Sequence, residues 1–388
     1  MAPPRVLFVN HTSKMSGAEF VLLDVVRPWA GASAFLFEHG PLEDELRARG
    51  LAIVCSRFGA GLSEIRRDRS LWSAAPLAGK LAALVAEIAA AARRHDLVYA
   101  NSQKAFVLAA FACALARRPL IWHLHDIIDA SHFGRAQRTL QVMLANRLAA
   151  RVVVPSKAGA AAFVAAGGRS DLVTIIPNGV DLGSQAPGEI GAPDEIRREL
   201  GLPKGALVGV FSRLAPWKGQ HVVLRALERL PDVQCLIAGD SLFGEQDYAR
   251  HLKEMADGPS LRGRVHFLGH RGDVPRLMRA VDVVIHPSVD PEPFGRTLVE
   301  AMLTKVPLIA SDAGAASDIL EGGRAGRLVK PDDPDALGAA ISAVLSRPPD
   351  LPDQLAYAAE RARAKYGVGE MQAEVTHVIC QVANGERA

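Results

Sequence analysis

Apolar residues occur in short continuous runs along the chain, and longer segments of helical periodicity separate these runs. In segment 77–94, leucine, valine and isoleucine recur at helical spacing, which predicts a helix with one apolar face. Continuous apolar strands that alternate with helices are typical of a parallel sheet covered on both faces. In the first part of the chain we predict strands at 6–9, 34–37, 52–55, 97–100, 120–124, 152–154 and 173–176.

A stretch at 183–194 that is rich in glycine and proline interrupts this alternation and has the composition of a linker. We therefore predict an α/β protein with two similar domains, at 1–185 and 196–366, joined by a linker at 186–195. Two doubly wound domains that face each other leave a cleft, and ligands are expected at the carboxyl ends of the strands. In the second domain we predict strands at 207–211, 235–238, 265–268, 283–285, 307–310 and 327–329.

The composition is that of a soluble protein, because 49% of the 388 residues are apolar and 22% are charged. The net charge of +3 comes without a basic tail or stripe, which argues against a protein that coats a polyanion. The longest apolar stretches, 81–92 and 105–116, are shorter than the roughly 20 residues of a membrane-spanning helix. The first strand begins almost at the N-terminus, so we expect no signal peptide and a cytoplasmic protein. Wide spacing argues against disulfides and structural zinc at Cys55, Cys113, Cys235 and Cys380.

The segment 286–302 carries the most informative polar residues and directly follows a predicted strand. Gly295 permits a close backbone approach, and the helix that begins near it offers an N-terminus to an anion. Glu292 in the loop and Glu300 in the helix could face one ligand, and hydroxyl groups are better partners for two carboxylates than a diphosphate. Taken alone, the two glutamates are better explained as a loop charge and a solvated helix residue.

A second segment, 210–219, places two cations after the first strand of the second domain. Arg213 offers a planar fork and Lys218 a point charge, a combination that suits a diphosphate. A solvated turn explains these two residues equally well when they are taken alone.

Together the two segments resemble the retaining glycosyltransferases of family 4, which have the GT-B fold of two Rossmann-like domains facing across a cleft. The resemblance spans residues 5–383, and the glutamate pair is its most diagnostic part. It implies that the C-terminal helix, at 367–388, packs back on the N-terminal domain. Further matching motifs are SGAE (16–19), WHLHD (122–126), VPS (154–156), IPNGVD (176–181), AGD (238–240), FLGH (267–270) and HPS (286–288).

The resemblance implies catalytic roles for Arg213, Lys218, Glu292 and His125. The two cations would stabilise the leaving nucleoside diphosphate, Glu292 would hold the transferred sugar, and His125 would bond a sugar hydroxyl. Glu300 would accept hydrogen bonds from the ribose. The remaining implied donor-binding residues lie in a loop over the diphosphate, in a loop facing the nucleobase and around the start of the helix: Gly17, Ala18, His270, Arg271, Phe294, Gly295, Thr297 and Leu298.

The implied reaction moves a hexose-type sugar from a nucleoside-diphosphate sugar to an acceptor hydroxyl, with retention of configuration. The donor would bind the C-terminal domain and the acceptor the N-terminal domain. The acceptor would be a cell-envelope glycan, a lipid-linked sugar or a small molecule, and neither a metal nor a resident cofactor is needed. The alternatives are a nucleotide-sugar epimerase or hydrolase of the same fold, and a non-catalytic protein that binds nucleotide sugars. No GxGxxG motif follows the first strand, which disfavours a nicotinamide dehydrogenase.

Two histidines and one acidic motif are further candidates for functional residues. We expect His123 and His125 to point to opposite faces of their strand, with His125 facing the site. The motif DPD at 333–335 is interpreted as a helix N-cap rather than a metal site. Two departures from the family pattern, Ala315 after Gly314 and Asp318 in place of glutamate, affect only the local loop.

Basic residues near helix 77–92 and near 135–151 leave contact with the inner face of a membrane open. An ordinary buried helix with charged ends is the favoured explanation of the first group. The residues concerned are Arg66, Arg67, Arg69, Lys80, Arg93 and Arg94 in the first group and Arg135, Arg138, Arg147 and Arg151 in the second.

Overall fold

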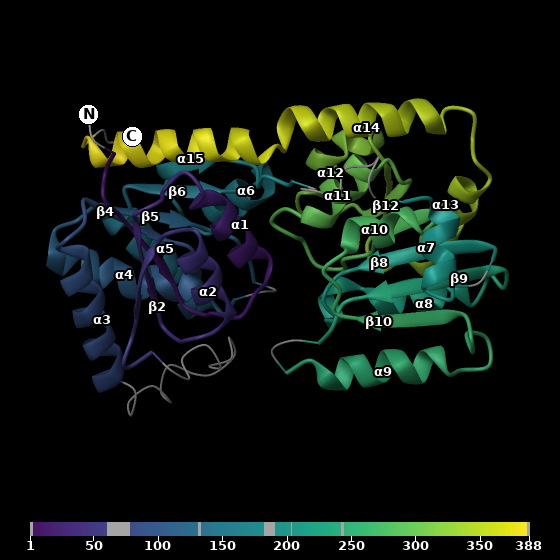
Figure 1. Ribbon diagram of the computed structural model, residues 1–388, viewed down its shortest axis with the longest axis horizontal. Coiled ribbons are helices and arrows are strands. Elements are labelled where there is room, and N and C mark those ends of the chain that lie inside the picture. The colour runs from purple at the N-terminus through teal and green to yellow at the C-terminus, as the bar shows by residue number, and fades with distance from the viewer. Residues whose placement is uncertain are drawn as a thin grey trace. The chain divides into compact units, whose positions relative to one another are not determined.

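The computed structural model describes residues 3–59, 78–130, 133–181, 191–202, 204–241 and 244–385 (Figure 1). The chain divides into two compact units. Unit 1 comprises Met1–Gly179 and Val368–Ala388, and unit 2 comprises Val180–Gly367.

The division between the units falls at residue 179, ahead of the linker expected at 186–195. The first half of that stretch, residues 186–190, lies outside the described residues. Its last residues already belong to helix α7 (Pro193–Glu199), where Pro193 takes a first-turn position that suits its fixed φ. Ile196 of this helix is buried with Ala280 of unit 2, so apolar burial makes α7 part of that unit.

Unit 1 is built on a parallel sheet in the order β3-β2-β1-β4-β5-β6-β7. The order reverses between β1 and β4, and Val9 of β1 lies between Phe35 of β2 and Ala100 of β4. Every run predicted in this part of the sequence forms one of these strands. Their bounds are β1 Val6–Asn10, β2 Ser33–Leu36, β3 Ala52–Cys55, β4 Leu97–Ala100, β5 Leu120–His123, β6 Arg151–Val154 and β7 Val173–Ile175.

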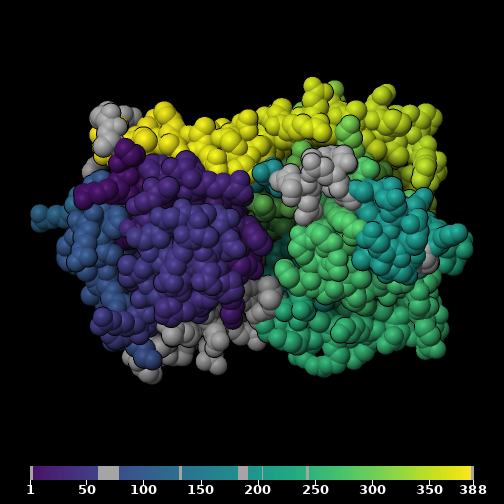
Figure 2. All heavy atoms as spheres, viewed as in Figure 1, coloured from purple at the N-terminus to yellow at the C-terminus, as the bar shows by residue number. Residues whose placement is uncertain are grey.

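Helices cover both faces of this sheet, and the sheet separates two apolar cores. One core includes Leu84 and Ile88 of α3 and Phe106 of α4. The other core joins α1 to α15, which contributes Val375 and Ile379. Figures 1 and 2 show α15 in yellow on the outside of unit 1, beside the purple N-terminal elements. The helices are α1 Gly17–Val25, α2 Pro41–Ala48, α3 Ala78–Ala92, α4 Gln103–Ala116, α5 Arg135–Leu148, α6 Lys157–Ala165 and α15 Val368–Ala383.

Unit 2 repeats the design with a parallel sheet in the order β10-β9-β8-β11-β12-β13. Its order reverses between β8 and β11, where Val283 of β11 pairs with Val208 of β8. The strands are β8 Ala206–Phe211, β9 Val233–Ala238, β10 Val265–Gly269, β11 Val283–His286, β12 Leu308–Ser311 and β13 Arg327–Val329.

Two helical layers again enclose the sheet of unit 2. One core lies under α10, α11, α12 and α14, and the other lies under α8, α9 and α13. These helices are α8 Gln220–Leu227, α9 Gln246–Ala256, α10 Val274–Arg279, α11 Arg296–Thr304, α12 Ala316–Ile319, α13 Pro334–Leu345 and α14 Leu351–Lys365. Over the described ranges, no helix combines the length and the apolar character that crossing a bilayer requires.

Candidate functional site

Two loops meet at the point in unit 2 where the strand order reverses. One follows β8 and carries Trp217, and the other follows β11 and carries Val289. The Val289 N–H donates a hydrogen bond to the Trp217 carbonyl at 2.9 Å. Gly219 ends the first loop at φ +71°, and a Cβ there would lie 2.0 Å from the Pro287 oxygen. Only glycine lets the two loops approach this closely.

Lys218 and Glu292, one from each loop, form a buried ion pair at this edge. The Lys218 Nζ atom lies 2.7 Å from Glu292 Oε2. The other carboxylate oxygen, Oε1, lies 2.9 Å from His286 Nε2 and accepts a hydrogen bond from the Ser288 hydroxyl. Burial by itself raises the pKa of Glu292, which is only 7% exposed, but Lys218 and His286 outweigh burial and hold that pKa well below 4.5. Glu292 is therefore a fixed anion.

His286 connects this pair to the start of α11. Its Nδ1 atom lies 3.0 Å from the Thr297 hydroxyl. Since Nε2 faces a carboxylate, Nε2 carries a proton and donates. Gly295 caps the helix at φ +92°. Phe294 and Leu298 are buried in the core, so their side chains position the loop and the helix rather than face solvent.

The backbone of Glu292 is held from its other side by the loop after β12. Gly314 has φ +60°, and a Cβ there would lie 2.2 Å from the backbone carbonyl oxygen of Glu292. Ala315, where the family pattern commonly has glycine, has an ordinary right-handed φ of −79°. Its N–H donates to the Glu292 carbonyl at 2.9 Å. Alanine at 315 therefore fits, and glycine at 314 is required.

Arg213 and Lys218 both lie over the ring of Trp217, a residue to which the sequence analysis gave no role. The Arg213 guanidinium lies 5.6 Å and Lys218 Nζ 4.4 Å from the centre of the ring. Arg213 Nε also lies 3.6 Å from Glu245 Oε2. The buried Gln220 amide donates to the Arg213 carbonyl at 2.8 Å and so stabilises the loop that carries both cations.

Glu300 differs from Glu292 in its electrostatic environment. It is half-buried in the second turn of α11, and burial raises its pKa, against an opposing effect of Arg296. Its side chain has no hydrogen-bond partner within the described parts of the chain. The role of Glu300 at the ribose of a donor stays a prediction.

His270 and Arg271 follow β10, two strands away from β8 in the sheet order. His270 is exposed. Arg271 is paired with Asp273, because its Nε and Nη2 atoms each donate to that carboxylate at 2.8 Å. A role at the nucleobase through the backbone remains a prediction.

The expectation that His123 and His125 point to opposite faces is wrong. Their rings lie against each other, with centroids 3.9 Å apart. Alternation along a strand has a period of two, so positions 123 and 125 project to the same side. His123 is buried and its Nδ1 lies 2.7 Å from the Tyr99 hydroxyl. Burial, helped by His125, holds the pKa of His123 well below 6.5, and burial lowers the pKa of His125 to about 4 against a small opposing effect of Asp126.

His125 is bonded to Asn101, which is bonded in turn to Asn10, and the sequence motifs pointed to neither asparagine. Its Nε2 atom lies 2.9 Å from Asn101 Oδ1. Asn101 follows β4 and also bonds the Ala18 carbonyl and Asn10, which ends β1. In unit 1 the structure thus brings His125 together with the Gly17–Ala18 start of α1. The signal available in the sequence was the polar residue at the end of each strand next to the order reversal.

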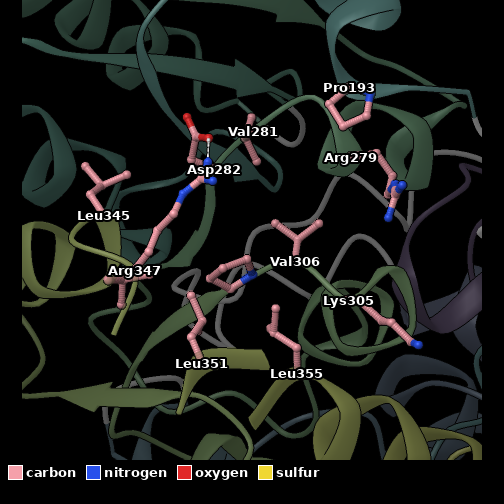
Figure 3. A pocket seen from close by; sticks show the side chains of 12 residues that line it. Pro193, Arg279, Val281, Asp282, Lys305, Val306, Leu345, Arg347, Leu351 and Leu355 are labelled. Atoms are coloured by element: carbon pink, nitrogen blue, oxygen red, sulfur yellow. Dashed lines mark ion pairs between the residues drawn. The ribbon is translucent and has the colours of Figure 1, made fainter. Parts of the chain in front are cut away.

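A cavity of about 290 Å³ lies at the opposite edge of the sheet in unit 2 (Figure 3). Val281 and Asp282 precede β11, and Val306 precedes β12, so these wall residues lie at the amino ends of the strands. In Figure 3 the Arg347 side chain reaches toward Asp282, to which it is ion-paired at 3.7 Å. This cavity is separate from the residues described above.

The remaining candidate motifs have structural roles or lie outside the described residues. Asp333 caps α13 by accepting the Ala336 N–H at 3.0 Å, which agrees with the N-cap interpretation. Lys80, Arg93 and Arg94 are exposed around α3, whose Leu84 and Ile88 are buried in the core. Arg66, Arg67 and Arg69 lie outside the described ranges.

One group of metal-ligand side chains, His39, Glu43 and Cys55, lies within 4.8 Å in unit 1. Glu43 is already paired with Arg47 at 2.5 Å and with His39 at 2.8 Å. Two side chains of the protein itself, Arg47 and His39, therefore already contact this carboxylate.

Comparison with known proteins shows two family models that together cover most of the chain. The model "Glycosyl transferases group 1" matches residues 193–362, and the model "Glycosyltransferase Family 4" matches residues 41–184. A phosphatidyl-myo-inositol mannosyltransferase of Mycolicibacterium smegmatis is 32% identical over 73% of this chain and 70% of its own. A lipopolysaccharide core biosynthesis mannosyltransferase of Rhizobium leguminosarum is 34% identical over 45% of this chain and half of its own.

Solved structures agree with these matches. The Anabaena protein Alr3699/HepE in complex with UDP-glucose is 36% identical, with a TM-score of 0.86 over 97% of this chain and all of that one. A sucrose-phosphate synthase of Thermosynechococcus elongatus, 19% identical with a TM-score of 0.79, shares the fold. The chain therefore belongs to the family 4 type of glycosyltransferases, enzymes of the GT-B fold.

Proposed function

We propose that this glycosyltransferase moves a hexose-type sugar from a nucleoside-diphosphate sugar to an acceptor hydroxyl and retains the configuration at the anomeric carbon. The observation that carries the proposal is the buried Lys218–Glu292 pair at the strand-order reversal of unit 2. Arg213 lies over the same Trp217 ring as Lys218. Glu300 follows on α11, and its side chain has no hydrogen-bond partner among the residues that the structure describes. The two cations suit the diphosphate of such a donor, and the two carboxylates suit its sugar and ribose hydroxyls.

In the proposed reaction the bond from the anomeric carbon to the diphosphate oxygen breaks, and a bond from that carbon to the acceptor oxygen forms. The acceptor proton passes to an oxygen of the leaving diphosphate, so no protein nucleophile takes part. Arg213 and Lys218 stabilise the charge that develops on the diphosphate. Glu292 accepts hydrogen bonds from the transferred sugar, and Glu300 accepts them from the ribose. Metal and resident cofactor have no part in the proposal.

UDP-glucose is the first donor to test, because the 36% identical Anabaena protein has been crystallised with it. GDP-mannose is the second, because two of the similar enzymes are named mannosyltransferases. The names of these two enzymes also favour an acceptor of the cell envelope, either a glycan or a lipid-linked sugar.

The test is a thermal-shift panel of UDP, GDP, ADP, CMP and dTDP with and without Mg²⁺, followed by a transfer assay with the matching sugar nucleotide. A ligand that binds the native state raises the melting temperature. We expect one diphosphate to stabilise the protein equally well in a chelator and the new linkage to keep the anomeric configuration of the donor. Free sugar as the product would indicate a hydrolase. Binding without turnover of any acceptor would indicate a non-catalytic protein, and no shift at millimolar ligand would contradict the donor site.

We also propose that unit 1 makes peripheral contact with the inner face of a membrane. Helices α4 and α5 pack together, expose Phe111, Leu115 and Met143, and carry the basic Arg135 and Arg147. Exposed apolar side chains and arginines on the same pair of helices suit an anionic lipid surface. Sedimentation with vesicles of phosphatidylglycerol, compared with phosphatidylcholine vesicles, tests this contact. Equal partitioning to both, or none to either, would contradict it.

A further inference from the structure

His125 of unit 1 is at one end of a hydrogen-bond chain whose direction the acceptor groups determine. Asn10 Nδ2 contacts two groups, the Thr12 carbonyl at 2.8 Å and Glu19 Oε1 at 3.0 Å. A backbone carbonyl can only accept a hydrogen bond, so the Asn10 atom that faces it must be the amide nitrogen. The amide oxygen of Asn10 is therefore the atom that faces Asn101.

The same argument fixes the amide of Asn101. Its Nδ2 atom lies 3.3 Å from Asn10 Oδ1 and 3.2 Å from the Ala18 carbonyl. Both of these neighbours are acceptors, so the nitrogen of Asn101 must face them. Its Oδ1 atom then faces His125 Nε2 at 2.9 Å. Turning this amide over would place oxygen against two oxygens and nitrogen against the imidazole.

The direction of the chain determines the tautomer of His125. The half-buried ring packs against His123, and its pKa of about 4 leaves it neutral near pH 7, so it carries one proton. Because Asn101 Oδ1 is an acceptor, that proton lies on Nε2. The second nitrogen, Nδ1, is left with a lone pair, and no bond to Nδ1 is present within the described parts of the chain.

We propose that Asn101 is a positioning residue that holds His125 as the Nε2–H tautomer, so that Nδ1 accepts a hydrogen bond from a sugar hydroxyl. The assignment of the hydroxyl to a sugar rests on the proposed function, whereas the tautomer does not. We call the hydrogen-bonded residues His125, Asn101, Asn10 and Glu19 the relay. Asn10 is its third member, and its amide oxygen fixes the orientation of the Asn101 amide. Glu19 anchors the relay at its far end and is itself bonded by the Ser16 hydroxyl.

The test reads the tautomer directly in the whole chain without substrate. Long-range ¹H–¹⁵N correlation of ¹⁵N-histidine-labelled protein distinguishes Nε2–H from Nδ1–H rings. The spectrum of His125→Gln identifies the His125 signals. We expect a pure Nε2–H pattern for wild-type His125 between pH 6 and 8. A Nδ1–H pattern, or a fast mixture of both tautomers, would overturn the proposal.

Two substitutions at Asn101 give opposite spectral results. Asn101→Ala removes the acceptor, so we expect His125 to become a mixture of tautomers and kcat to fall about tenfold, the value of one hydrogen bond. Asn101→Asp keeps an acceptor and adds a charge, so we expect the Nε2–H tautomer to persist while the pKa of His125 rises above 4. The titratable groups beside the ring in the described structure are His123 and Asp126, and neither changes in these variants.

Asn146→Asp is the matched control. Asn146 is an amide of the same unit that bonds the Gly167 carbonyl and the Arg169 N–H, and it takes no part in the relay. We expect the His125 signals and kcat of this variant to match the wild type. A His125 spectrum unchanged by Asn101→Ala in folded protein would remove Asn101 from the role. A correct tautomer in an enzyme that transfers no sugar would instead contradict the proposed function and leave the relay in place.

Discussion

Lys218 and Glu292, which lie 74 positions apart in the sequence, form an ion pair of 2.7 Å in unit 2. The pair exists because β8 and β11 are neighbours in the sheet and the loops that follow them are bonded to each other. His286 and Ser288 hold the second oxygen of the same carboxylate. A donor diphosphate would enter a site in which the Lys218 side chain is already oriented. The entropy cost of ordering that side chain on binding would therefore be lower.

Removing the cation should destabilise unit 2, because it leaves Glu292 buried with less compensation. For Lys218→Met we expect a loss of about 3 kcal/mol in the free energy of unfolding, the usual effect of breaking a buried pair. The double variant Lys218→Met with Glu292→Gln should recover most of this loss. Urea unfolding of both variants measures it. A single variant as stable as the wild type would show that the pair contributes nothing.

The same pair should make stability depend on acid pH. The pKa of Glu292 is well below its ordinary 4.5 in the folded protein, so its contribution is complete above about pH 4.5 and is lost as the pH falls toward the folded value. Thermal melts from pH 7 to pH 3 should therefore fall less steeply for Glu292→Gln than for the wild type. Parallel curves would contradict the lowered pKa.

Glu300 should affect the pH dependence of stability in the opposite direction. Its pKa is raised by burial, so its charged form costs stability at pH 7, and this cost disappears as the pH falls toward 4.5. Glu300→Gln should melt higher than the wild type at pH 7 and equally at pH 4.5. It should also bind the preferred nucleoside diphosphate about tenfold more weakly, because it loses a charged acceptor for the ribose. Calorimetric titration measures the second effect, and unchanged affinity would remove Glu300 from that role.

Removing both cations tests the assignment of the diphosphate. Arg213→Ala with Lys218→Ala should abolish transfer and weaken nucleoside-diphosphate binding by about a hundredfold, since two charged contacts are lost. Arg250→Ala is the control, because Arg250 is an exposed arginine of the same unit that pairs with Asp247. Undiminished turnover in the double variant would end the assignment.

Gly314 and Gly322 offer a matched pair for testing the support of Glu292. Both have a positive φ, +60° and +63°, but only at Gly314 would a Cβ meet the backbone of Glu292. Gly322→Ala should cost about 1 kcal/mol for the left-handed backbone alone. Gly314→Ala should cost about 3 kcal/mol, because the overpacking adds to that strain, and donor affinity should fall with it. Equal losses of stability in the two variants would show that the loop of Glu292 moves aside without cost.

Much of the architecture was predictable because continuous apolar strands between helices have few stable arrangements. Every predicted strand is present, and the helix expected at 77–94 is α3. The pattern also located the ends of β8 and β11, and Lys218 and Glu292 follow these two strand ends. Taken alone, the residues did not show that the two cations or the two glutamates act together, and their roles at a donor stay predictions. The boundary at residue 179 was not predictable from composition, because the burial of Ile196 draws α7 into unit 2 and leaves the glycine-rich stretch inside it.

The contacts inside each site were decided by the tertiary structure alone. Nothing in the spacing of the sequence shows that Trp217 lies beneath both cations, that Gly314 supports Glu292, or that the ring of His123 packs against that of His125. Asn10 and Asn101 meet because β1 and β4 are neighbours at the strand-order reversal. The sequence by itself determined which residues stand at the ends of strands, since apolar periodicity is local. Sheet order decides which of those strand ends meet, and burial decides which of their side chains are charged. Sheet order and burial arise only when the chain has folded.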